Sequence, residues 1–117
     1  MLDGLDAMFR FQAEALKLRS QRQELLAANI ANADTPNYKA VDIDFGAALK
    51  AATDGGPGAV QSDPTVLYRT PSQASLDGNT VEMDAERAKF ADNTVRYEAA
   101  LRVLNAQIKT MLTAMQS

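Results

Sequence analysis

The fold is decided by residues 81–117, which read VEMDAERAKFADNTVRYEAALRVLNAQIKTMLTAMQS. A set of mainly apolar side chains recurs here at alternating steps of four and three: Met83, Arg87, Phe90, Thr94, Tyr97, Leu101, Leu104, Ile108, Met111 and Met115. This heptad spacing is typical of a helix that packs along its length against another helix. We therefore predict a long helix over 81–117.

A partner for this helix is predicted at the other end of the chain, over 1–33. Ala, Leu, Gln, Glu and Arg dominate this stretch, and all of them favour helix. Its apolar stripe is broad and is interrupted by Arg19 and Arg22. We expect an all-α fold in which these two long terminal helices, about 40 and 50 Å in length, pack as a coiled-coil-like hairpin.

The segment between the helices, 34–80, has a different composition. It holds all four prolines and five of the six glycines, including the run Gly-Gly-Pro-Gly at 55–58. These residues break regular structure, so we expect a mostly irregular linker, with Val66 to Arg69 as a short extended segment. The chain as a whole, 1–117, is predicted to be a single unit.

Composition excludes several classes of function. The net charge of −3 argues against a nucleic-acid partner, because phosphate binding needs an excess of Lys and Arg. The chain has no His and no Cys, so the commonest general base, nucleophilic thiols and the commonest metal ligands are absent. No stretch approaches the roughly 18 to 20 apolar residues that cross a bilayer. We expect no enzyme activity, no catalytic or metal site, no cofactor and no membrane insertion.

The heptad admits two interpretations. It is either the core of a monomeric hairpin or a surface that also packs against neighbouring subunits. We favour the second, because two long helices and an irregular linker bury too little area to offset chain entropy comfortably. The candidate packing and assembly seam consists of Phe11, Leu18 and Leu25 in the first helix and Phe90, Tyr97, Leu101, Leu104, Ile108, Met111 and Met115 in the last.

A motif lies at the end of the first helix, where residues 28–40 read ANIANADTPNYKA. A helix C-terminus followed by a turn explains the stop at Pro36, but it leaves the repeated asparagines unexplained. The motif resembles the N-terminal signature of flagellar rod and hook proteins. The stretches DFGAALK at 44–50 and SLDGNTVEMDAERAKF at 75–90 are similar to the proximal-rod members of this family.

The resemblance implies a function and a set of signature residues. It implies a structural subunit of the proximal rod of the bacterial flagellar basal body, which assembles into the tube that transmits torque and surrounds the export channel. The signature positions are Asn29, Asn32, Thr35, Pro36, Tyr38 and Lys39. Asn37 stands where many relatives have glycine, so we expect a left-handed turn there.

The resemblance also implies partners and a location. The partners are further copies of the chain, other rod proteins, the ring-to-rod adaptor, the MS-ring protein and the export gate. The location is the periplasmic rod, reached through the flagellar type III apparatus without a cleaved signal peptide; the acidic start at Asp3 and Asp6 agrees with this route. The rival interpretations are another short rod component and a soluble helical adaptor or chaperone of a secretion system.

Overall fold

A computed structural model describes residues 2–54, 66–69 and 76–116. The elements in chain order are α1 (Leu2–Ala31), β1 (Val41–Ile43), α2 (Phe45–Asp54), β2 (Val66–Tyr68) and α3 (Met83–Gln116). The two terminal helices contain most of the described residues, which confirms the predicted all-α class. The glycine-rich run at 55–58 lies outside the described residues.

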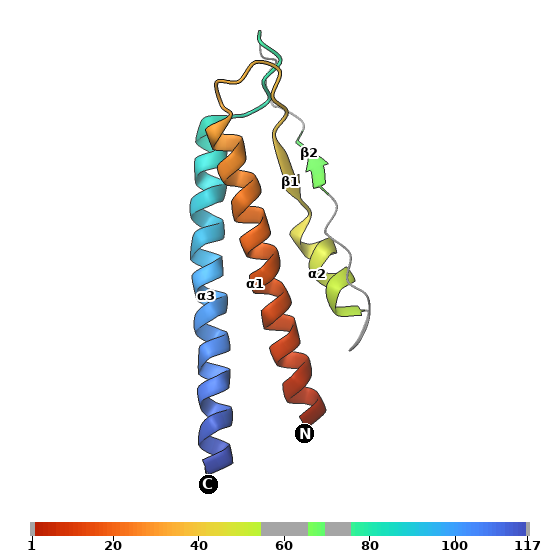
Figure 1. The fold of residues 1–117 in the computed structure, drawn as a ribbon, viewed down its shortest axis with the longest axis vertical. Coiled ribbons are helices and arrows are strands. Elements are labelled where there is room, and N and C mark those ends of the chain that lie inside the picture. Colours follow the sequence, from red (N-terminus) through yellow and green to blue (C-terminus); the bar gives the residue numbers. More distant parts are fainter. Residues whose placement is uncertain (1, 55–65, 70–75, 117) are drawn as a thin grey trace.

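The terminal helices α1 and α3 run antiparallel and side by side, and both chain termini lie at the same end of the molecule (Figure 1). This is the predicted hairpin. The ends at Ala31 and Met83 each lie two residues inside the predicted boundaries. The described structure measures 64 × 26 × 18 Å, so it is a rod-shaped subunit with one long axis.

The connecting segment contains a helix that the sequence analysis did not anticipate. The ten-residue helix α2 begins directly after Asp44, whose side chain accepts a hydrogen bond from the amide of Ala47 at 3.1 Å. An aspartate in this position caps a helix by binding one of its free amides. Helix α2 packs on the side of α1 away from α3, so α1 is the central element of the molecule (Figure 1).

Two short strands form an antiparallel pair beside α1. The register pairs Val41 with Tyr68, Asp42 with Leu67 and Ile43 with Val66. The extended segment predicted at Val66 to Arg69 is therefore present as β2. The sheet matters for the site because it brings Asp42 and Arg69 beside the helix hairpin.

The buried apolar core is small and consists of Ala15, Leu18, Leu26, Ala40 and Ile43. Ala15, Leu18 and Leu26 lie on α1 between its middle and the loops, and Ala40 and Ile43 lie at β1 beside α1. In the half of the hairpin away from the loops, formed by residues 4–14 of α1 and 94–116 of α3, none of the described side chains is buried. Within the described ranges, no helix combines the length and apolar character needed to cross a membrane.

Candidate functional site

The signature turn ends α1 through hydrogen bonds made by its own residues. The side-chain amide of Asn32 donates to the carbonyl of Ala28 at 2.8 Å, and its oxygen accepts from the Thr35 hydroxyl at 3.1 Å. The amide of Thr35 bonds back to the carbonyl of Asn32 at 3.0 Å, and Tyr38 bonds back to Thr35 at 3.2 Å. Pro36 is exposed at the tip of this turn. The motif thus folds the chain sharply away from the helix axis.

Asn79 was not among the predicted site residues, but it binds the turn that follows α1. Its side-chain amide donates to the carbonyls of Asn32, Ala33 and Thr35 at 2.9, 3.0 and 2.7 Å. These carbonyls belong to the turn that follows α1, where the backbone leaves the helix and its groups need donors from outside the helix. The residue that leads into α3 therefore satisfies the backbone at the end of α1, so the two helix ends are fixed to each other.

Two residues with left-handed backbone lie against each other in this cap. Asn37 has a φ of 64°, as expected from its place in the signature, and Gly78 has a φ of 75°. The amide of Asn37 donates to the carbonyl of Asp77 at 2.8 Å, and Lys39 donates from Nζ to the carbonyl of Gly78. A Cβ on Gly78 would collide with Oδ1 of Asn37, and the positive φ also disfavours a side chain there.

Asn29 is the signature residue with the largest number of long-range contacts. It is fully buried, and its side chain pairs with the backbone of Val41 in both directions, at 2.7 and 3.0 Å. Its amide also donates to Glu86 on α3 at 3.0 Å, and the Tyr38 hydroxyl donates to its oxygen at 3.4 Å. One asparagine therefore joins α1, β1 and α3.

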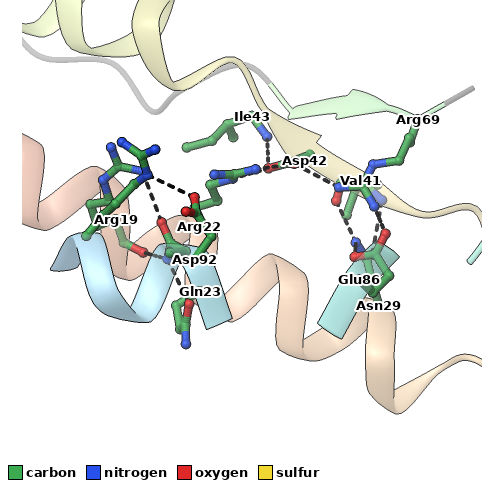
Figure 2. Close-up of polar contacts among 12 residues, drawn as sticks. Arg19, Arg22, Gln23, Asn29, Val41, Asp42, Ile43, Arg69, Glu86 and Asp92 are labelled. Carbon is green, nitrogen blue, oxygen red and sulfur yellow. Dashed lines mark hydrogen bonds and ion pairs between the residues drawn. The ribbon is translucent and has the colours of Figure 1, made fainter. Parts of the chain in front are cut away.

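A chain of ion pairs extends from Asn29 across the sheet (Figure 2). Arg22 binds the Asp42 carboxylate through two atoms, at 2.9 and 3.1 Å, and Arg69 binds the same carboxylate at 2.8 Å. Arg69 also pairs with the fully buried Glu86. Two arginines and two carboxylates thus alternate in charge and compensate one another in a low-exposure site.

The environment of Asp42 keeps it ionised. Burial raises the pKa of this carboxyl group, but hydrogen bonds from Arg22, from the amide of Ile43 and from Arg69 lower it, and the net pKa lies below its ordinary value of 3.8. Since an ionised Asp42 is the common partner of Arg22 and Arg69, the network persists at neutral pH.

A second polar layer lies nearer the middle of the helices. Asn93, fully buried on α3, donates to the carbonyl of Arg19 at 2.9 Å and to the side chain of Gln23 at 2.7 Å. Gln23 in turn donates to the Thr94 hydroxyl at 2.6 Å. The guanidinium of Arg19 stacks 3.6 Å above the ring of Phe45, a cation–π contact that ties α2 to the same layer.

The predicted seam residues divide into three groups by exposure. Leu18 is buried. The half-buried members are Leu25, Phe90, Tyr97, Leu104 and Met111. The exposed members are Phe11, Leu101, Ile108 and Met115, with exposed fractions of 45, 38, 42 and 75%. In the single subunit these four seam residues thus remain open to solvent, and the role of the seam in assembly stays a prediction.

Several of the residues that build this site were not among the predicted ones: Arg22, Asp42, Arg69, Asn79, Glu86 and Asn93. One signal was visible, because Arg19 and Arg22 interrupt the apolar stripe of α1, and such interruptions indicate a polar partner. The partners themselves come from segments far apart in the chain. Among the described residues, no group of three or more His, Cys, Asp or Glu is arranged to hold a metal ion.

The comparison with known proteins agrees with the signature turn. The family model described as "Flagella basal body rod protein" matches residues 9–39, which span most of α1 and the whole turn through Lys39. Flagellar basal body rod protein FlgB of Salmonella typhimurium is 52% identical over 135 aligned positions, which cover 99% of this chain and 98% of the relative. This chain belongs to the flagellar basal body rod protein family.

Other flagellar basal body rod proteins are similar over the same extent. FlgB of Escherichia coli is 51% identical, with 100% of this chain and 99% of the relative covered, and FlgB of Cereibacter sphaeroides is 47% identical, with 98% of each covered. The predicted resemblance is confirmed. These relatives are named as rod proteins and not as enzymes, so the chain is a structural component of the flagellar basal body that assembles with other rod components.

Proposed function

We propose that this chain is a structural subunit of the proximal rod, which assembles with itself and with other axial proteins into the tube that transmits torque and surrounds the export channel. The observation that carries the proposal is similarity over almost the full length of both chains to rod proteins of the FlgB type. The long axis of the subunit and its two antiparallel helices, which lie side by side, suit a part of a tube wall.

The open half of the hairpin supplies the surface for assembly. Large apolar side chains are exposed there on both helices: Leu5, Met8 and Phe11 on α1 and Leu101, Val103, Ile108, Leu112 and Met115 on α3. Clustered exposed apolar residues mark surfaces that bind other proteins. Contact with neighbouring subunits would bury them and add the stability that the small core does not provide.

The half of the hairpin near the loops differs, because it contains the buried residues and the ion pairs. We assign it the role of the rigid part of the subunit. Here α1, α3, the two strands and the turn after α1 are held together within the single subunit. The contacts are the buried residues, the ion pairs and the hydrogen bonds of Asn79. The half near the loops then holds the two helices in position, and the half with exposed apolar side chains binds the neighbouring subunits of the helical lattice. Torque would then pass through paired helices rather than through loops.

Specific neighbours are part of the same proposal. A subunit at the proximal end of the rod would contact the ring-to-rod adaptor, the MS-ring protein and the export gate, and it would reach the periplasm through the flagellar type III apparatus. Secretion of an epitope-tagged chain by a strain that lacks the rod tests this route, with a strain lacking the export ATPase and gate as the control.

Electron microscopy of purified basal bodies tests the function directly. A clean deletion strain is compared with the same strain carrying the gene on a plasmid. Rings without a rod in the deletion, and rods restored by the plasmid, are the expected results. Rods of normal appearance in the deletion strain would overturn the proposal and favour an adaptor or chaperone of the secretion system.

A further inference from the structure

The centre of the α1–α3 interface is polar. The largest fully buried side chains among the described residues are Leu26, Glu86, Asn29 and Asn93, so three of the four carry polar groups. Burying a polar group contributes less stability than burying an apolar side chain of the same size, even when it is hydrogen-bonded. The best-attested use of such a group in a helix pair is to select one alignment of the helices.

We propose that Asn93 sets the register of α1 against α3. Its amide donates to the backbone carbonyl of Arg19 at 2.9 Å and to Oε1 of Gln23 at 2.7 Å, while its oxygen accepts from Arg19 at 3.4 Å. Both the donor and the acceptor of the side chain are thus bound to one turn of α1. Apolar seam residues have no such directional contact, and many of them are only half-buried.

The spacing of the polar layers makes a slipped alignment unfavourable in both directions. Glu86 and Asn93 are one heptad apart on α3, and Glu86 lies opposite Asn29 near the end of α1. A slip of one heptad one way places Asn93 opposite Asn29 and moves Glu86 past the end of α1 at Ala31. The opposite slip brings Gln12 and Leu16 to the places of Arg19 and Gln23, so the amide of Asn93 loses the side-chain acceptor that Gln23 provides.

The register has a consequence for assembly, and this step rests on the proposed function. The exposed apolar side chains of the open half come from both helices, so their relative positions depend on the alignment of α1 and α3. A slip of one heptad moves the exposed apolar side chains of α3 by about 10 Å along those of α1. Identical subunits in one lattice need one alignment, and Asn93 provides it within the subunit.

Pulsed electron spin resonance on the isolated chain tests the inference. The chain has no Cys, so two nitroxide labels can be attached at Glu24→Cys and Ala106→Cys, both exposed positions on α1 and α3. In this background the expected result is a single narrow distance. Asn93→Leu should add a second population displaced along the helix axis by about 10 Å, with an unfolding midpoint equal to or higher than that of the parent.

A matched control and a second variant keep the test decisive. Asn105→Leu makes the same change at an exposed position of α3 and should leave one narrow distance. Asn93→Ala removes the amide without adding volume and should also produce the second population. A single unchanged distance in either Asn93 variant would overturn the proposal and assign the register to the Asn79 cap. A broad distribution in the parent background would overturn it as well.

The measurement is independent of the proposed function. It follows the fold of the isolated subunit and does not require rings, rods or export. If the Asn93 variants keep a single distance while the deletion strain lacks rods, the register proposal fails and the rod function stands. If the distances confirm the register while the deletion strain still forms rods, the rod function fails and the register stands.

Discussion

Arg22 and Asp42 form a two-point ion pair, with Nε 2.9 Å from Oδ1 and Nη2 3.1 Å from Oδ2. The pair joins the middle of α1 to β1, and the same carboxylate holds Arg69 of the neighbouring strand at 2.8 Å. A planar guanidinium and a planar carboxylate in this arrangement fix distance and orientation together. This aspartate therefore links both strands of the sheet to α1, in addition to the hydrogen bonds between Asn29 and Val41.

Asp42→Asn should destabilise the subunit by about 2 kcal/mol, because it leaves two low-exposure guanidinium groups without their common counter-charge. The urea dependence of far-UV circular dichroism measures the change in the free energy of unfolding. Asp92→Asn is the matched control: Asp92 pairs with Arg96 on the exposed surface, where such pairs contribute little. Equal effects of the two substitutions would contradict the role assigned to Asp42.

The contribution of Asp42 should disappear in acid. Burial raises the pKa of Asp42, but the hydrogen bond from Arg22, the hydrogen bond from the amide of Ile43, the charge of Arg22 and the hydrogen bond from Arg69 together lower it below the ordinary value. A group whose pKa is lower when folded stabilises the protein fully above its unfolded-state pKa, and this stabilisation is lost as the pH falls through the folded-state pKa. The free-energy difference between the wild type and Asp42→Asn should therefore shrink below about pH 4. A difference that stays constant down to about pH 2 would contradict this.

Gly78→Ala should destabilise the subunit by about 1 to 2 kcal/mol. The left-handed backbone at φ 75° disfavours a Cβ, and that Cβ would also collide with Asn37. Gly46→Ala is the control, because the nearest atom to its Cβ would be Oδ1 of Asp44 at an ordinary 3.8 Å, and alanine favours the helix α2. Thermal unfolding should show a lower midpoint for the first variant and an equal or higher one for the second.

Asn79→Ala should cost about 1 to 3 kcal/mol, because three backbone carbonyls in the turn that follows α1 lose a side-chain donor. Amide hydrogen exchange followed by mass spectrometry should show faster exchange in the turn after α1 and in the first turn of α3. Exchange that speeds up equally along both helices would indicate global loss of stability and not loss of a local cap.

Ile108→Asp should separate assembly from folding. Ile108 is 42% exposed in the subunit, so its substitution should change the free energy of unfolding by about 0.5 kcal/mol or less. In the assembled rod the same position would bury an unpaired charge, so motility should be lost. Leu104→Asp should impair both properties, because Leu104 is half-buried already in the subunit.

The exposed neighbour Asn105 provides the control for this experiment. Asn105→Asp adds the same charge three residues from Ile108 without replacing a seam residue. Swimming in soft agar should be retained in this variant. Full motility of the Ile108→Asp strain, with normal rods in micrographs, would remove Ile108 from the assembly surface.

The helices themselves could be read from local sequence. The heptad from Met83 to Met115 and the helix-favouring composition of α1 predicted both elements, since apolar periodicity and helix propensity act over short distances. The signature turn was also visible, because Pro36 and the asparagines around it act on neighbouring backbone. Helix α2 was missed because its cap, Asp44, and its few apolar residues gave too weak a signal beside the glycine-rich run that follows.

The sequence by itself thus determined two long helices, a sharp stop between them and membership of a structural family. Only the tertiary structure decided that Asn29 faces Glu86, that Asp42 serves two arginines, and that Asn79 caps a helix 44 to 47 residues earlier in the chain. A buried polar group is stable only with its partner, and nothing in the local sequence of one partner names the other. Helices follow from neighbours along the chain, whereas pairing of buried polar groups follows from the packing of distant segments.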